Sequence, residues 1–132
     1  FDISCRDSNF HAFPSKQVGY LYCCGTRAEA GGLPLVLDEV HNYGRKGRIF
    51  MVHLRNVRGS FATAGGFEET LLDDGDMNMG KILLELEKVG FDGCINPDHI
   101  PGLEGDEGVL GRGLAYSVGY IKGLFAMLAA VK

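Results

Sequence analysis

Residues 49–54 read Ile49-Phe50-Met51-Val52-His53-Leu54, a nearly continuous apolar run with the length of one β-strand. Shorter runs of the same kind lie on either side of it in the sequence, at residues 20–23 and 93–96. Continuous apolarity is typical of strands that are covered on both faces, as in a parallel sheet between helices. The sequence therefore predicts a parallel sheet, buried on both faces, that contains these three segments.

Helical periodicity fills the intervals between and after these runs. Apolar residues repeat at helical spacing over residues 33–43 and again over residues 79–89. Asp76 is the expected N-cap of the second helix, and Gly90 is the expected residue after its end. A third pattern runs from about Gly113 to the end of the chain and carries few charges, so we expect it to be well packed. The resulting order is β-α-β-α-β-α, which is typical of an α/β fold.

Length and composition indicate one globular domain at most. The chain has 132 residues, of which 45% are hydrophobic, and 13 Lys and Arg against 17 Asp and Glu give a formal net charge of −4. This composition argues against a disordered chain, and the lack of a basic tract argues against nucleic acid as a partner. No apolar run approaches the ~18 residues of a membrane span, so we expect no membrane association. Residues 1–13 are expected to form a poorly defined N-terminal segment.

The cysteines indicate a reducing compartment. Cys5, Cys23, Cys24 and Cys94 lack the density and spacing of a disulfide-rich secreted scaffold, and the sequence has no CxxC pair. Cys23 and Cys24 are adjacent and would bridge only through a strained ring. We therefore expect reduced thiols and a cytoplasmic protein.

Side chains that bind metals lie at the ends of all three predicted strands. Cys23 ends the first strand, and His53 lies near the end of the second. Asp98 and His99 follow the third. Because the C-terminal ends of parallel strands meet at one edge of a sheet, these side chains are expected to converge. Arg55 shares a strand face with His53, so that a metal or an anionic ligand would compensate the buried charge.

Each of these residues also has a purely structural interpretation. A cysteine at a strand end is usually a small buried hydrophobe, and His53 taken alone is equally well a hydrogen-bonded core histidine. Asp98 alone would cap a turn, and Arg55 with Asn56 would lie in a solvated loop. Joint placement at three strand ends favours a metal site over these alternatives.

Several segments of the chain match one known enzyme family. The most specific are His53-Leu54-Arg55-Asn56-Val57 and Pro97-Asp98-His99, and the others lie within residues 21–26, 47–59, 67–79, 89–93 and 116–124. In this order the segments resemble mannonate dehydratase, from about residue 14 to the end of the chain. The resemblance implies a (β/α)8 TIM barrel of the xylose-isomerase-like type. A closed barrel typically needs ~250 residues, so we expect residues 1–132 to be a single partial domain, the C-terminal portion of the barrel with about three βα units.

The resemblance also implies a reaction and a metal. Mannonate dehydratases convert D-mannonate to 2-keto-3-deoxy-D-gluconate in hexuronate catabolism, with Mn²⁺ or Fe²⁺ as the cofactor. Their metal is held by a cysteine, an aspartate and two histidines. Cys23, His53 and Asp98 match three of these ligands, and the remaining histidine is expected on a strand that precedes residue 1.

Four further residues receive roles from the resemblance. His99 is the candidate for general acid/base work, and Tyr116 is a second candidate. The alternative for Tyr116 is a helix residue whose hydroxyl reaches solvent. Arg55, with Asn56 beside it, is expected to bind the carboxylate of the sugar acid.

Two other functions remain open at the level of sequence. A sugar isomerase or epimerase of the same fold would use the same metal site without loss of water. A truncated fragment or assembly module would instead pack against a partner through its open sheet edges. We expect either a homo-oligomer or pairing with the missing part of the barrel.

Overall fold

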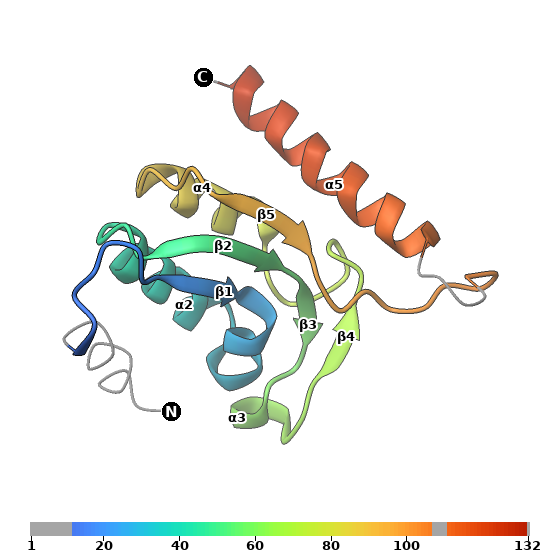
Figure 1. Cartoon of the computed structure of the whole chain (residues 1–132). Coiled ribbons are helices and arrows are strands. Elements are labelled where there is room, and N and C mark those ends of the chain that lie inside the picture. The colour runs from blue at the N-terminus through green and yellow to red at the C-terminus, as the bar shows by residue number, and fades with distance from the viewer. Residues whose placement is uncertain (1–11, 107–110, 132) are drawn as a thin grey trace.

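A parallel sheet of three strands lies at the centre of the computed structural model, which describes residues 12–106 and 111–131 (Figure 1). The strands are β1 (Tyr20–Cys23), β2 (Ile49–Leu54) and β5 (Cys94–Pro97), and β2 lies between the other two. Both pairings are parallel, and Cys23 is the register partner of His53. The predicted strands and their parallel arrangement are confirmed, with β5 starting one residue later than expected. The expected N-terminal segment, residues 1–13, lies almost wholly outside the described residues.

Helices α2 (Cys24–Gly44) and α4 (Met79–Lys88) cover one face of the sheet (Figure 1). Tyr22, Val52 and Leu54 are buried on this side, together with apolar residues of both helices. The neighbouring position Leu21 is 54% exposed. The prediction of a sheet buried on both faces is therefore wrong for this part of the chain, because none of its described helices packs over Leu21.

Helix α2 starts directly after β1 and bends in its middle. Gly32 has φ 67° and ψ −167° within the helix, and Pro34 follows. The predicted helix 33–43 is thus only the second half of α2, since the glycine and proline resemble a helix boundary in sequence. Across the bend, Arg27 Nε and Nη2 each donate a hydrogen bond of 2.6 Å to the carboxylate of Glu39. Both side chains are buried, so this ion pair connects the two halves of the helix inside the protein.

Helix α4 is the predicted second helix with a different N-cap. Asn78 is the N-cap residue, and its side chain accepts a hydrogen bond of 3.0 Å from the main-chain N–H of Lys81. Asp76, which was the expected cap, instead accepts a hydrogen bond from the N–H of Gly59. Gly90 follows the helix with φ 73°, as predicted from its position.

A small antiparallel ribbon follows β2 and is absent from the prediction. It consists of β3 (Asn56–Arg58) and β4 (Glu68–Thr70), with the single-turn helix α3 (Phe61–Ala64) between them. Strands of three residues are too short to give a period-2 signal, which explains why the sequence did not reveal them. The ribbon lies at the C-terminal end of β2 (Figure 1).

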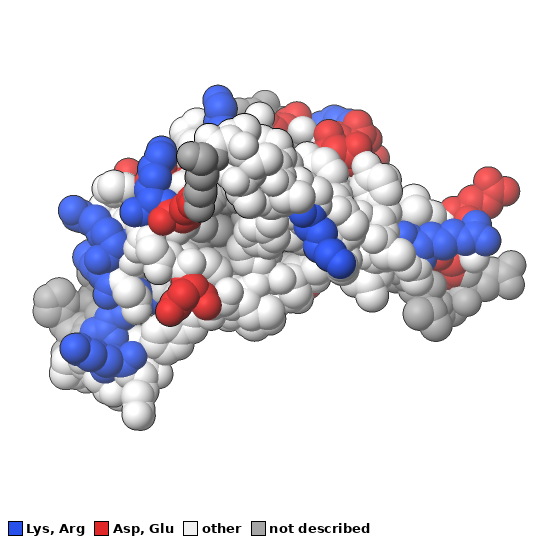
Figure 2. All heavy atoms as spheres, turned by 90° about the horizontal axis from the view of Figure 1, so that it is seen from above, with Lys and Arg blue, Asp and Glu red and all other residues white. Residues whose placement is uncertain are grey.

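Helix α5 (Gly111–Ala130) is much less buried than its composition suggests. Its buried residues are Gly113, Ser117, Ile121 and Leu128, and its exposed apolar residues are Leu114, Tyr116, Val118, Phe125 and Met127. The expectation of a well-packed helix is therefore wrong in this chain. Seen from above, the face of the molecule that includes α5 is mostly uncharged (Figure 2).

By length and composition α5 is also apolar enough to cross a membrane, so the expectation that the chain contains no run of this length is wrong. A single helix of this kind is weak support for a membrane span. Ile121 and Leu128 belong to the hydrophobic core of the chain. The helix therefore packs against the rest of the chain along one side.

Candidate metal centre

The ends of β1, β2 and β5 bring the three predicted metal ligands together. Cys23 is the last residue of β1, His53 lies beside it on β2, and Asp98 directly follows β5. Their donor atoms all lie within 4.8 Å of one another. Asp98 Oδ2 is 3.2 Å from His53 Nδ1 and 3.7 Å from Cys23 Sγ. The predicted convergence of these side chains is therefore confirmed.

The donor set of this cluster suits a transition metal. It offers a sulfur, an imidazole nitrogen and a carboxylate oxygen, and all three residues are partly buried at the edge of the sheet. Distances of 3.2–3.7 Å between donor atoms are compatible with a common ion bound at ~2.0–2.3 Å. Imidazole and thiolate favour iron, zinc and similar metals, whereas a carboxylate also suits manganese. The donor set thus fits a divalent transition metal, which includes the Mn²⁺ or Fe²⁺ expected from the resemblance.

The side chain of Cys24 points away from that of its neighbour Cys23, and its thiol is in a different environment. It is completely buried at the start of α2, on the helix side of the sheet. Burial, together with the nearby Cys23, raises the pKa of the Cys24 thiol, which therefore stays protonated. Of the two adjacent cysteines, only Cys23 belongs to the cluster. The described cysteines Cys23, Cys24 and Cys94 are free thiols.

Arg55 lies directly beside this cluster and is held by two carboxylates. Its side chain is only 4% exposed, and Nη2 donates to Glu29 Oε1 at 2.6 Å. Glu69 forms a two-pronged ion pair with the guanidinium, with Nε to Oε2 at 3.1 Å and Nη2 to Oε1. Burial alone would lower the pKa of Arg55. Hydrogen bonds to Glu69 and Cys23 raise the pKa by a larger amount, so the net shift is upward. The anionic compensation expected for Arg55 thus comes from the protein's own residues.

Asn56 is also buried, and its amide is fully used within the protein. It is 0% exposed, and Nδ2 donates to the main-chain oxygens of Leu72 and Met77 at 2.8 and 3.0 Å. Oδ1 accepts from the N–H groups of Val57 and Met77. This arrangement argues against the predicted contact between Asn56 and a substrate, because no atom of the amide is accessible.

Of the two candidate acid/base residues, His99 lies next to the cluster, whereas Tyr116 contacts other residues. His99 follows Asp98 in the left-handed region at φ 45°, and its largely exposed ring is 3.8 Å from Asp98 Oδ2 and 3.7 Å from Glu69 Oε1. Tyr116 is exposed on α5, where its ring stacks on that of Tyr120. A hydrogen bond to Asp73 raises the pKa of Tyr116 to about 12. The fold thus brings His99 to the cluster of Cys23, His53 and Asp98, whereas Tyr116 contacts Asp73 and Tyr120.

Glu29 and Glu69 were missed by reasoning from the sequence. Glu29 lies in the first half of α2, which was not predicted, and Glu69 lies in the unpredicted strand β4. The one available signal was the Phe67-Glu68-Glu69 segment within the family resemblance.

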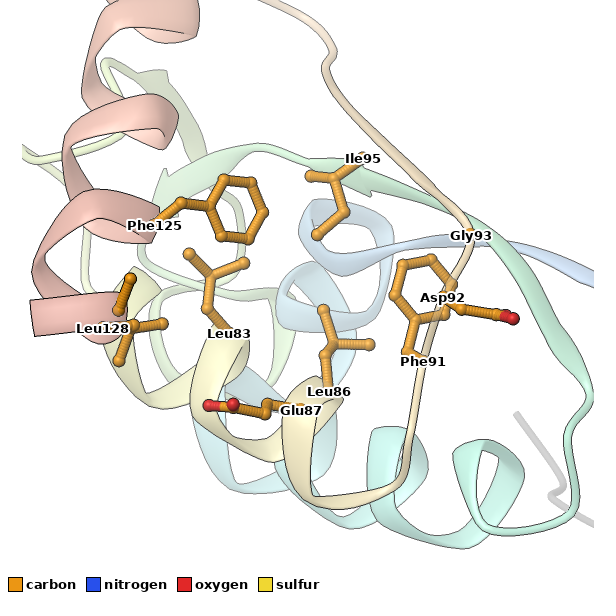
Figure 3. Close-up of a pocket in the computed structure, with 10 residues that line it drawn as sticks. Leu83, Leu86, Glu87, Phe91, Asp92, Gly93, Ile95, Phe125 and Leu128 are labelled. Atoms are coloured by element: carbon orange, nitrogen blue, oxygen red, sulfur yellow. The ribbon is translucent and has the colours of Figure 1, made fainter. Parts of the chain in front are cut away.

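A separate pocket lies between α4, β5 and α5, and most of its lining side chains are apolar (Figure 3). It has a volume of about 410 Å³ and includes Leu83, Leu86, Ile95 and Phe125. Its carboxylates, Glu87 and Asp92, lie at the margin, and none of the three metal-binding candidates lines it. The chemistry available in this part of the chain therefore lies at the strand ends instead of in this pocket.

Comparisons with known proteins match the chain to one enzyme family. The family model of D-mannonate dehydratase (UxuA) matches residues 11–132. Mannonate dehydratase 2 of Halalkalibacterium halodurans is 28% identical over 123 residues, which are 89% of this chain and 35% of that protein. Mannonate dehydratase of Enterococcus faecalis is 31% identical over 114 residues, 81% of this chain and 30% of that protein.

A solved structure shows the same arrangement of the chain. The crystal structure of mannonate dehydratase from Streptococcus suis serotype 2 matches with a TM-score of 0.77 and 27% identity. The match covers 93% of this chain and 36% of the other. This chain therefore spans about a third of the length of the relatives that it matches.

Proposed function

Since the chain belongs to the D-mannonate dehydratase family, we propose that it forms part of an enzyme that removes water from D-mannonate to give 2-keto-3-deoxy-D-gluconate. The observation that carries this proposal is the convergence of Cys23, His53 and Asp98 at the C-terminal ends of three parallel strands. A family match alone does not show that this chain keeps the chemistry, whereas the convergence of three donor side chains supports it.

In this proposal Cys23 Sγ, His53 and Asp98 are the metal ligands. A bound Mn²⁺ or Fe²⁺ supplies Lewis acidity, which stabilises negative charge that develops on the substrate oxygens during proton loss. The triad contains one histidine, and the second histidine of the family would come from outside these residues.

The proposed reaction needs a proton acceptor at C2 and a proton donor at C3. The C2–H bond breaks as its proton passes to a base, the C3–O bond breaks as the hydroxyl takes a proton, and a C2–C3 double bond forms. The resulting enol becomes the 2-keto product when C3 takes up a proton and the C2 hydroxyl loses one. His99 is the proposed acid/base residue because its ring lies beside Asp98 and is accessible. Tyr116 remains the second candidate.

We further propose that the sheet is the C-terminal portion of a (β/α)8 barrel of the xylose-isomerase-like type. The order β1-β2-β5 leaves β1 and β5 each paired on one side among the described residues, as expected for strands cut from a closed sheet. The sheet face of Leu21, partly open here, would then face the barrel interior. The free thiols support a cytoplasmic location. We also propose that a homo-oligomer, or pairing with the rest of the barrel, completes the structure.

The decisive test is product formation by the protein expressed from its complete gene. Incubation with D-mannonate and Mn²⁺ is expected to give 2-keto-3-deoxygluconate, detected as a 2-keto acid. Cys23→Ala and His53→Ala are each expected to lower the rate by about 100-fold or more, because even indirect supports of metal ligands contribute about 10–100-fold. Cys94→Ala and His41→Ala replace exposed residues of the same types and should retain activity.

The same assay separates the other functions. Activity that survives both Cys23→Ala and His53→Ala would overturn the site. A ketose or epimeric product without loss of water would identify an isomerase or epimerase. Absence of both product and metal binding would favour a non-catalytic fragment or assembly module.

A further inference from the structure

We propose that Arg55 is a positioning residue, which orients the sulfur of Cys23 for metal binding and is itself fixed by Glu29 and Glu69. This inference rests on the metal site of the proposed function. It replaces the expected contact of Arg55 with the substrate carboxylate, because Glu29 and Glu69 already bind its guanidinium.

The nitrogen atoms of the Arg55 guanidinium contact different partners. Nε and Nη2 face Glu69, and Nη2 also donates to Glu29. Nη1 is directed to Cys23 Sγ at 3.8 Å and to Thr26 Oγ1 at 3.4 Å. Because the five N–H groups of arginine have a fixed geometry, two bound carboxylates on one side determine where Nη1 points. The direction of the hydrogen bond to the sulfur is thus set by groups that are not themselves ligands.

The surroundings of Arg55 are shaped for this side chain. A Cβ atom added at Gly25 would lie 2.2–2.5 Å from Cγ, Nε and Cδ of Arg55, so the side chain passes directly over the glycine. The ring of Phe67 lies on the guanidinium, with 5.9 Å between its centroid and Cζ. Residues from β1, α2, β4 and the segment before β4 therefore surround a single arginine next to the cluster.

Groups that hold metal ligands in place typically contribute about 10–100-fold to metal affinity. Removing the charge of Arg55 would also change the electrostatic attraction of a cation, so the informative variants conserve charge. Arg55→Lys keeps the positive charge but loses the planar fork that reaches both carboxylates and the sulfur. Gly25→Ala keeps every polar group and displaces the arginine through steric contact with the new methyl group.

The experiment measures Co²⁺ binding to the metal-free protein expressed from its complete gene. Two quantities are followed: the dissociation constant for Co²⁺ and the near-ultraviolet charge-transfer band that a thiolate ligand gives with this ion. Arg55→Lys and Gly25→Ala are each expected to weaken Co²⁺ binding by about 10-fold or more and to shift or weaken the band. A merely structural role for Arg55 would leave the band of the folded protein unchanged.

Matched controls are available in the neighbouring ribbon. Arg58→Lys changes an exposed arginine that pairs with Glu68 and Asp74, and Gly66→Ala adds a methyl group with nothing within 4 Å. Both should bind Co²⁺ as the unaltered protein does. Circular dichroism verifies the fold of each variant, and Arg55→Lys decides the question if Gly25→Ala does not fold.

The outcomes distinguish this inference from the proposed function. A folded Arg55→Lys protein with unchanged affinity and an unchanged band would overturn the role of Arg55 and leave the metal site intact. If the unaltered protein binds no Co²⁺, or if Cys23→Ser retains the band, then the metal site itself is wrong and the inference falls with it.

Discussion

Asn56 holds together the segments that follow the sheet next to the candidate metal centre. It is the first residue of β3, directly after Arg55, and its amide contacts the main chain at residues 57, 72 and 77. These contacts tie the ribbon β3–β4 to the loop that leads into α4. Since Glu69 is carried by β4, Asn56 also helps to place one of the two carboxylates that hold Arg55.

Asn56→Ala is therefore expected to destabilise the protein by about 2–4 kcal/mol, because buried main-chain groups lose their partners at a cost of about 1–3 kcal/mol each. Denaturant unfolding of the variant measures this free energy. Asn42→Ala is the matched control, since Asn42 is only partly buried and its side chain donates to the main-chain oxygen of Asp38 within α2. A loss below about 1 kcal/mol for Asn56→Ala would show that its network is replaceable, for example by water.

At the scale of elements, a buried ion pair spans the bend in α2. Arg27 and Glu39 lie on opposite sides of Gly32 and are joined by two hydrogen bonds of 2.6 Å. The Tyr22 hydroxyl donates to the same carboxylate at 3.0 Å, and burial raises the pKa of Tyr22, so the hydroxyl stays protonated. The bent helix, strand β1 and this pair thus form one unit that carries Cys23 at its edge.

Replacement of one partner should leave a buried charge without compensation. Arg27→Met is expected to cost about 3–5 kcal/mol of unfolding free energy. The double variant Arg27→Met/Glu39→Gln should recover a large part of this loss. It removes the uncompensated carboxylate and keeps a hydrogen-bond acceptor for the Tyr22 hydroxyl. Urea unfolding of the single and double variants provides the measurement. Equal losses in both would contradict a charge-based role for this pair.

For the whole molecule, the arrangement leaves apolar surface uncovered. α5 exposes Leu114, Val118 and Phe125, and the sheet has edges at β1 and β5 among the described residues. Exposed strand edges and apolar patches favour association with other chains. In the proposed complete barrel, further strands would pair with these two edges.

The 132-residue chain produced alone is therefore expected to self-associate, as measured by size-exclusion chromatography with light scattering. Val118→Glu should weaken this association by placing a charge on the exposed face of α5. Gln17→Glu adds the same charge at an exposed polar position and should have little effect. A monodisperse monomer at tens of micromolar would contradict the prediction.

Much of the fold and the metal triad could be predicted from local patterns. β1, β2 and β5 are short apolar runs, and parallel strands necessarily place Cys23, His53 and Asp98 at one edge. The helix boundaries were less predictable, because α2 continues through Gly32 and the cap of α4 lies at Asn78. Here tertiary contacts and local hydrogen bonds outweigh the propensity of single residues.

The partners of Arg55 and Asn56 were decided only by the folded chain. Glu29 lies 26 residues from Arg55 and Glu69 lies 14 residues from it, so no local pattern links them. The exposure of α5 likewise depends on which elements are present to cover it. Sequence order and periodicity determine which side chains lie at the strand ends, because the extent of each strand is a local property and a β-α-β order makes the strands parallel. Pairing of buried charges depends on packing between distant segments, which only the three-dimensional structure defines.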